Sequence, residues 1–209
     1  MKTWTDDNPK AGLLMRKREA ILVAARRQFL AHGYGGTSME GVAAAAGVSI
    51  MTLYRHAESK DELFAAVVAI ACHNPDEPEP DLSQFSLADI LTGTAIGFQE
   101  KLTSPETVAL LRAVIAEQER FPELATITYD ATLGHLTDVV DQVLAGASEA
   151  RGVAPERLTE ITAAFVDDLF GVDTLRVLLG LSGRTSAQQR AQADVATRRL
   201  LAALEQPAA

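Results

Sequence analysis

The sequence lacks what a disulfide framework or a multi-cysteine metal site requires, because Cys72 is its only cysteine. It is also poor in strand-forming residues. Aromatic side chains make up 5% of the chain, β-branched residues are comparatively few, and no segment shows the alternation of apolar and polar residues that is typical of a strand. Alanine, the strongest helix former, is frequent. The sequence therefore predicts an all-α fold.

No apolar run approaches the roughly 20 residues that a membrane-spanning helix requires. Residues 1–10 read MKTWTDDNPK and lack the apolar core of a secretory signal. Hydrophobic residues make up 47% of the chain and charged residues 22%, a composition typical of a globular protein with a sizeable core. We expect a soluble, cytoplasmic protein without a membrane partner.

Patterns of catalytic, cofactor or metal sites are missing as well. The four histidines are scattered and none has the spacing of a helical di-iron motif. The GYGG segment, residues 33–36, lacks the lysine of a phosphate-binding loop and is predicted to be a turn, and no serine lies in a nucleophile elbow. Asp167 and Asp168 are adjacent and point about 100° apart on a helix, so they cannot share a proton. We expect no enzyme activity, no cofactor and no metal.

Charge is distributed unevenly along the chain. The net charge of −9 argues, as an average, against a nucleic-acid partner. Residues 1–73, however, carry nine Lys and Arg against seven Asp and Glu, a balance of +2, whereas the remainder carries ten against twenty-one, a balance of −11. A basic end on an acidic molecule is typical of a protein that binds a polyanion there. A solvated basic helix face gives the same pattern.

Start and stop signals divide the chain into about nine helices. Gly33 is a natural left-handed C-terminal cap, and the pairs Thr37–Glu40 and Ser59–Glu62 have the spacing of capping boxes. The proline-rich segment HNPDEPEPD, residues 73–81, is predicted to be an extended connection between two domains. The predicted helices span about residues 16–32, 38–46, 49–56, 60–72, 86–102, 122–146, 155–180 and 186–204, with a further one starting at Pro105.

The segment GVSIMTLYRHAESKDELF, residues 47–64, combines hydroxyl, cationic and large apolar side chains. Two helices joined by a tight turn with a glycine, here AGVS at residues 46–49, describe a helix-turn-helix whose second helix enters the DNA major groove. The groove offers phosphate oxygens, base edges and thymine methyls. Matching donors are Ser49, Thr52, Tyr54, Arg55 and His56, and matching apolar side chains are Ile50 and Met51. The spacing of the two helices alone fits an ordinary helical scaffold too, but the polar residues on both sides of Leu53 favour a DNA-binding helix.

Residues 16–68 resemble the DNA-binding domain of the tetracycline-repressor (TetR) family. Over GYGGTSMEGVAAAAGVSIMTLYRHAESKDELF, residues 33–64, the glycines, hydroxyls and aromatic residue fall in register with the family's pattern. One departure is Ala57, where the family commonly carries an aromatic residue that anchors the recognition helix. The resemblance implies that phosphates are bound by Ser49, Tyr54, His56 and Lys60, that bases or groove walls face Ile50, Met51, Thr52 and Arg55, and that the DNA backbone is clamped by Thr37 and Ser38.

The resemblance weakens past Ala71, and what it implies there is architectural. It implies a homodimer through the last two helices and an apolar cavity for a small effector. An apolar face of the penultimate helix is consistent with such an interface, although a helix buried within its own domain shows the same face; it comprises Leu158, Ile161, Phe165, Leu169 and Val172. Each candidate for the cavity lining is equally compatible with plain core; the candidates are Phe98, Leu102, Leu111, Ile115, Gln118, Phe121, Tyr129, Leu133, Phe165 and Asp168.

Together these features predict a flexible arm over residues 1–15, a helix-turn-helix domain with its linking helix over residues 16–72, and a larger effector-binding and dimerisation domain over residues 73–209. The expected function is that of a ligand-responsive transcriptional regulator, a repressor that binds a near-palindromic operator as a dimer. A small apolar effector would release it by shifting the helix over residues 60–72. Two alternatives stay open: an all-helical small-molecule-binding protein or enzyme that retains the N-terminal helices, and a non-sequence-specific DNA binder.

Overall fold

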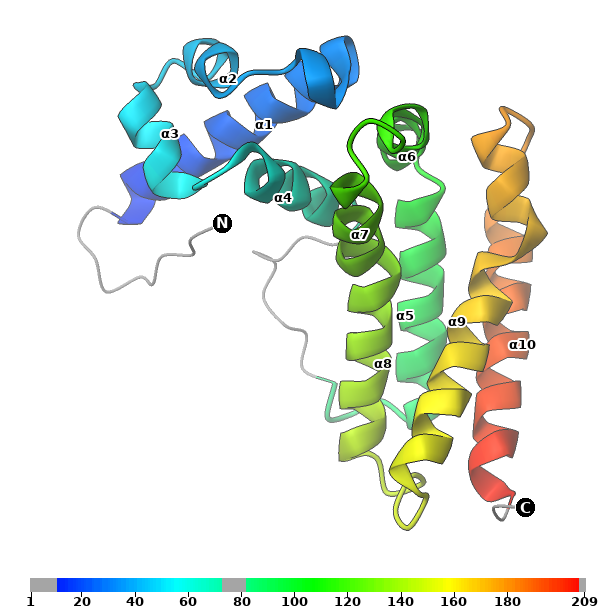
Figure 1. Ribbon diagram of the computed structural model, residues 1–209. Coiled ribbons are helices and arrows are strands. Elements are labelled where there is room, and N and C mark those ends of the chain that lie inside the picture. Colours follow the sequence, from blue (N-terminus) through cyan, green and yellow to red (C-terminus); the bar gives the residue numbers. More distant parts are fainter. Residues whose placement is uncertain (1–10, 73–81, 207–209) are drawn as a thin grey trace. The chain divides into compact units, whose positions relative to one another are not determined.

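The computed structural model describes residues 11–72 and 82–206, and every regular element in these ranges is a helix (Figure 1). The predicted all-α fold is confirmed. Packing divides the described chain into two compact units. Unit 1 contains residues 11–71 and 109–131, and unit 2 contains residue 72, residues 82–108 and residues 132–206. The predicted connection over residues 73–81 and most of the predicted arm lie outside the described residues, whereas residues 11–15 are already helical.

Unit 1 is built around a three-helix head. The head consists of α1 (Ala11–Gly36), α2 (Met39–Ala45) and α3 (Ile50–His56). Helix α4 (Lys60–Cys72) follows it, and all but its last residue belong to this unit. Residues 109–117 of α6 (Pro105–Glu117) and the whole of α7 (Glu123–Tyr129) belong to the same unit. The largest apolar side chains that are fully buried in this unit are Ile21, Phe29, Leu53, Leu63, Phe64, Leu110 and Leu124.

The end of α1 shows how glycine shapes the head. The helix is broken at Gly33, which has φ 69 and ψ 179, a backbone conformation that favours glycine. The next helix is capped by Ser38, whose hydroxyl accepts the Gly41 N–H at 3.0 Å. The prediction of a Thr37–Glu40 capping box is therefore wrong by one residue. Thr37 is buried, and its hydroxyl donates to the Gly33 carbonyl at 2.7 Å.

Unit 2 is a bundle of antiparallel helices. It contains α5 (Leu87–Leu102), the start of α6 (Pro105–Glu117), α8 (His135–Gly146), α9 (Pro155–Leu178) and α10 (Ser186–Glu205). The helix predicted from Pro122 to Gly146 is present as a continuous run in which α7 and α8 are joined by a π-helical turn, η1 (Asp130–Gly134). Helix α10 packs on both α5 and α9, and small residues such as Ala193 and Ala196 are fully buried where the helices approach.

Helix α9 is broken at Gly171, which has φ 45 and ψ −177. Before the break, Ile161, Phe165 and Leu169 are buried within the subunit. After it, Val172 is 74% exposed. The predicted apolar face therefore does not continue to Val172, because the break rotates the second half of the helix out of the α-helical register.

Among the residues that the structure describes, none of the helices is both long enough and apolar enough to cross a membrane.

Candidate nucleic-acid interface

Helix α3 is held by local bonds at its start and by the core beneath it. Ser49 caps the helix: its hydroxyl accepts the Thr52 N–H at 3.1 Å and also lies 2.9 Å from the Thr52 hydroxyl. Leu53 is fully buried and fixes the inner face of the helix. Ala57 ends it in an extended conformation and is also fully buried. At this departure from the family pattern, a small side chain is therefore still packed into the core.

The outer face of α3 is presented to solvent. Met51 is 75% exposed and Tyr54 43% exposed, and Arg55 is exposed as well. With the half-buried Thr52, these side chains line one shallow surface depression. The face thus combines a guanidinium, a phenol, a hydroxyl and a thioether, which are the groups needed to contact phosphates, base edges and thymine methyls.

The structure places three of the ten candidate DNA contacts elsewhere. His56 is only 1% exposed, and burial, followed by the nearby Arg55, Arg18 and Lys17 charges, lowers its pKa. The imidazole therefore belongs to the core of unit 1. The Thr37 hydroxyl donates to the Gly33 carbonyl at the broken end of α1.

Lys60 is the third of these residues. Its ammonium donates to the Tyr34 carbonyl at 3.0 Å and to the Thr37 carbonyl at 3.2 Å, and it lies 4.1 Å from the centre of the Tyr34 ring. The break at Gly33 leaves these carbonyls outside the helical hydrogen-bond ladder, and the lysine satisfies them. The half-buried ammonium is thus engaged within unit 1, and its contact with a phosphate stays a prediction.

Sequence reasoning missed a cluster that surrounds this lysine. Tyr34 stacks on Phe29 and meets Phe64 and Phe121 edge to face, with centroid distances of 5.0–6.0 Å. Its hydroxyl donates to the Asp61 carboxylate, and its backbone N–H donates to the Glu117 carboxylate. Burial, followed by the bond to Asp61, raises the pKa of Tyr34. The glycines on both sides of this tyrosine were the only local signal.

The ten candidates for an effector cavity are divided between the two units. Phe98, Leu102 and Phe165 are buried in unit 2, where they form part of its core. Phe121 packs on Tyr34 in unit 1. Leu111 and Leu133 are half-buried, in units 1 and 2 respectively, whereas Ile115, Gln118 and Tyr129 of unit 1 are exposed. The ten candidates thus do not all belong to one unit, and their role as a cavity lining stays a prediction.

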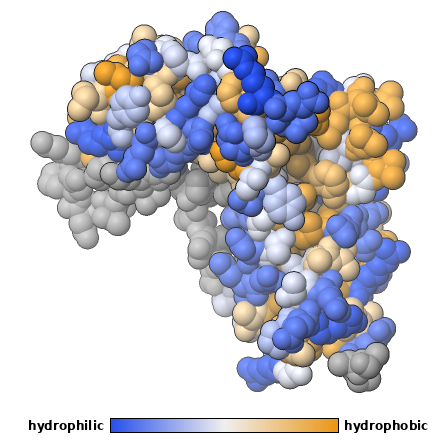
Figure 2. All heavy atoms as spheres, viewed as in Figure 1, coloured by the Kyte–Doolittle hydropathy of each residue, from blue (hydrophilic) through white to orange (hydrophobic). Residues whose placement is uncertain are grey.

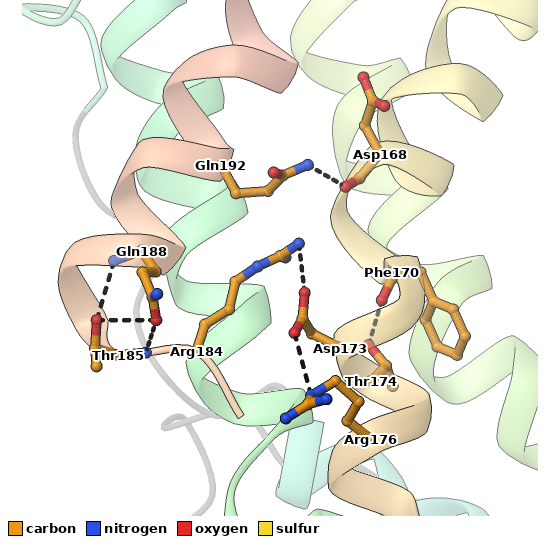
Figure 3. Close-up of polar contacts among 9 residues, drawn as sticks. All are labelled: Asp168, Phe170, Asp173, Thr174, Arg176, Arg184, Thr185, Gln188 and Gln192. Atoms are coloured by element: carbon orange, nitrogen blue, oxygen red, sulfur yellow. Dashed lines mark hydrogen bonds and ion pairs between the residues drawn. The ribbon is translucent and has the colours of Figure 1, made fainter. Parts of the chain in front are cut away.

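Asp168, the last candidate, helps to support the break in α9 (Figure 3). Its backbone carbonyl accepts the Gln192 amide at 2.6 Å, and its carboxylate lies 2.8 Å from the Arg199 guanidinium. The hydroxyl of Thr174 donates to the Phe170 carbonyl. Because a helical break deprives carbonyls of their usual partners, these side-chain donors make the break at Gly171 tolerable.

Beyond the break, the chain exposes apolar side chains. We call this set the α9 apolar patch; it comprises Val172, Leu175, Leu179 and Leu181. In Figure 2, apolar surface gathers on the side of unit 2 where the second half of α9 runs in Figure 1. Exposed apolar side chains that gather in this way are typical of interaction surfaces.

Two family profiles match the chain. One is described as "Bacterial regulatory proteins, tetR family" and matches residues 21–67. The other is described as "AefR-like transcriptional repressor, C-terminal domain" and matches residues 89–206, more than half of the chain. Both profiles describe regulatory proteins, and together they cover the three-helix head and the bundle.

Individual relatives agree. The HTH-type transcriptional regulator UidR of Escherichia coli K12 is 26% identical over 162 residues, which cover 74% of this chain and 79% of UidR. The solved structure of "Flavonoid-responsive Regulator FrrA" is 30% identical, with a TM-score of 0.68 over 90% of this chain and 97% of FrrA. A regulator from Pseudomonas syringae pv. tomato is 26% identical, with a TM-score of 0.59 over 89% of this chain and 95% of its own.

Proposed function

This chain belongs to the TetR family of bacterial transcriptional regulators, and from that premise we propose that it is a repressor which binds a near-palindromic operator as a homodimer. The observation that supports the proposal most directly is the outer face of α3. Met51, Tyr54 and Arg55 stand out from a helix whose inner face is fixed by Leu53. A rigid helix with donors and apolar surface on its free side is suited to direct readout in a major groove.

The roles within this face follow from chemistry. Arg55 is the candidate for a bidentate contact to guanine or for a phosphate contact, and Tyr54 and Ser49 are candidates for phosphates. Met51 and Ile50 would contact thymine methyls, with Thr52 beside them. Ser38 is exposed at the start of α2 and remains a candidate for the DNA backbone. His56, Thr37 and Lys60 would act by supporting the head from inside.

The homodimer is proposed to form through α9 and α10, with the α9 apolar patch as its centre. Four apolar side chains that are more than half exposed in one subunit favour a partner that covers them. A second copy placed by a two-fold axis brings the same patch against itself. We propose that the dimer binds DNA with its two α3 helices about one DNA turn apart, roughly 34–36 Å.

The regulatory half of the proposal draws on two similarities. The profile that matches residues 89–206 describes repressors, and FrrA, at 30% identity, is described as flavonoid-responsive. We propose that a small apolar or aromatic effector binds the C-terminal region and favours a state in which the two α3 helices miss successive grooves. Differential affinity of about 1–3 kcal/mol between the two states is enough for a useful response.

Site selection from random duplex DNA with the purified chain tests the proposed binding to an operator. We expect two inverted half-sites whose centres lie about 10 base pairs apart, or a multiple of that. Equal affinity for selected and random duplex at fixed salt would select the non-specific alternative. A panel of flavonoids added to the operator complex then tests the proposed response to an effector. Release of the operator supports it, whereas chemical conversion of a panel member would favour the enzyme alternative.

A further inference from the structure

A hollow in unit 2 lies between the second half of α9 and the start of α10. Its volume is about 600 Å³, within the range of roughly 300–1,000 Å³ that is typical of small-molecule sites. The residues of its lining that matter here are Asp173, Arg176, Arg184, Ala191 and Val195. None of them belongs to the proposed DNA-reading face or to the candidates for an effector cavity. We call this hollow the α9–α10 hollow.

Two guanidiniums and one carboxylate give the hollow a surplus of positive charge. The Arg184 guanidinium lies 2.7 Å from one oxygen of Asp173, and the Arg176 Nε lies 3.9 Å from the other oxygen (Figure 3). One carboxylate neutralises one guanidinium, so the three groups together carry a charge of +1. An ion pair is thus already formed, and one unit of positive charge is left over.

Arg176 is the group that can bind a further anion. Its 3.9 Å separation from Asp173 is too long for a hydrogen bond. Within the described ranges, no other residue binds its guanidinium, and its side chain is about half exposed. The two terminal nitrogens of Arg176 are therefore available to a ligand. The planar fork of a guanidinium matches a carboxylate, to which it can donate two parallel hydrogen bonds.

The backbone around the hollow is fixed before any ligand binds. The Leu181 N–H donates to the Arg176 carbonyl at 2.9 Å, which is the bond that closes a helix end in a Schellman motif. The following loop packs closely on α9, because a Cβ atom at Gly183 would lie 2.7 Å from a methyl carbon of Val177. Arg184 is the next residue, so its guanidinium extends from a constrained backbone. Preorganised groups of this kind bind a ligand at a lower entropic cost.

We propose that the α9–α10 hollow binds a small organic carboxylate. The carboxylate would pair with Arg176, and its organic part would lie against the apolar side of the lining, Ala191 and Val195. A single negative charge matches the surplus of +1. A phosphate monoester carries up to about two negative charges, and beside Asp173 it would leave the hollow with a net negative charge. This site is separate from the uncharged apolar effector of the proposed function, and it does not depend on DNA binding.

Titration of the full chain with cinnamate tests the proposal, with cinnamamide as the uncharged analogue and inorganic phosphate as the second anion. Two readouts are suitable: the NMR signals of the arginine Nε–Hε groups, and isothermal titration calorimetry. We expect cinnamate to shift the Arg176 and Arg184 signals until they saturate. Cinnamamide lacks the charge that pairs with the guanidinium, and phosphate carries too much of it. We therefore expect both to bind more weakly than cinnamate.

Two variants should change the affinity for cinnamate in opposite directions. Arg176→Gln removes the proposed partner of the carboxylate, so we expect binding roughly tenfold weaker. Asp173→Asn keeps the size of the side chain but removes the competing carboxylate, which raises the surplus from +1 to +2. We expect this variant to bind cinnamate several-fold more tightly, because like charges beside each other are unfavourable. General damage to the fold would weaken binding in both variants.

Arg190→Gln is the matched control, because Arg190 is exposed on α10, lies outside the lining and loses the same charge. It should bind cinnamate as the wild type does. The absence of a saturable response in the wild type would overturn the proposal, and so would equal binding of cinnamamide or phosphate. Unchanged affinity in Arg176→Gln would overturn it as well.

Sedimentation of Arg176→Gln distinguishes a free ligand from a carboxylate of a second copy of the chain. Arg176 is adjacent in sequence to Leu175 of the α9 apolar patch, so a neighbouring subunit could also supply the anion. If the anion is a free ligand, this variant should keep the sedimenting mass of the wild type. A mass reduced to half would show that a subunit contact occupies the hollow, and would overturn the proposal.

Discussion

The Arg184 guanidinium lies 2.7 Å from the Asp173 carboxylate, and this ion pair joins the loop before α10 to the chain just beyond the break in α9 (Figure 3). Both side chains are partly exposed, so the pair by itself contributes at most about 1 kcal/mol. Its importance is geometric. With the Gln192 amide on the Asp168 carbonyl, it fixes how the second half of α9 leaves the bundle.

Gly171→Ala should destabilise the protein, because φ 45 and ψ −177 lie in a region that is essentially restricted to glycine. We expect the free energy of unfolding to fall by about 1–3 kcal/mol. Gly97→Ala is the matched control: Gly97 lies in the interior of α5 with open space around it, so this variant should gain about 0.5–1 kcal/mol. Denaturant titrations of both variants check the opposite signs, and equal effects would contradict the proposed role of the break.

The α9 apolar patch should control assembly. We expect the double variant Leu175→Glu and Leu179→Glu to sediment at half the mass of the wild type, because four buried carboxylates at a self-complementary interface are costly to desolvate. Leu13→Glu is the matched control, since Leu13 is 57% exposed and Leu175 is 56% exposed. Analytical ultracentrifugation distinguishes the outcomes. If the patch variant keeps the wild-type mass, the patch is not the dimer interface.

Arg55→Ala should weaken operator binding by roughly 1–3 kcal/mol if the guanidinium contacts a base, and should relax specificity at that base pair. A phosphate contact would instead weaken all sequences alike and lower the salt dependence. Arg151→Ala removes the same charge from an exposed loop of unit 2 and is the control. Fluorescence anisotropy at two salt concentrations measures both quantities. Unchanged affinity in Arg55→Ala would remove this residue from the interface.

Met51→Ala should alter sequence preference more than charge-dependent affinity. The thioether is the most exposed apolar group of α3, and contact with a thymine methyl would bury it. We expect a loss of at least about 0.8 kcal/mol, the value of one buried methylene, and a weaker preference for A·T at one position of each half-site. Met15→Ala, on the exposed surface of α1, is the comparison. Selection with both variants tests the expectation, and identical preferences would contradict it.

His56 predicts acid sensitivity of the head. Its folded pKa lies below the ordinary value of 6.5, so the unfolded chain takes up the proton first as the pH falls. Stability is therefore fully present above about pH 6.5 and decreases below it. The half-buried imidazole of His135, whose pKa is also lowered by desolvation, acts in the same direction. We expect His56→Phe to reduce, but not abolish, the difference in unfolding free energy between about pH 7.5 and about pH 5.5. An unchanged difference would exclude His56 as a source.

The sequence by itself determined the helices and indicated which of them we propose as the DNA-reading helix. Capping at Ser86 and the helix starts at Pro105, Pro155 and Ser186 depend on contacts within a few residues, and so does the break in α1 at Gly33, where the sequence predicted the end of the helix. The mixture of side chains on α3 likewise depends only on composition and on the position of Leu53. Local hydrogen bonding and helical periodicity are encoded in neighbouring residues, so they could be predicted without a tertiary structure.

Only the tertiary structure decided which polar side chains face outward. His56 and Lys60 carry groups suited to phosphate, yet burial encloses the first, and the ammonium of the second donates to the Tyr34 and Thr37 carbonyls. The Glu117 carboxylate accepts the N–H groups of Tyr34 and Gly35, which are 83 and 82 positions away, and the break at Gly171 depends on a donor from α10. These features arise where distant segments satisfy each other's backbone groups, which no local pattern in the chain specifies.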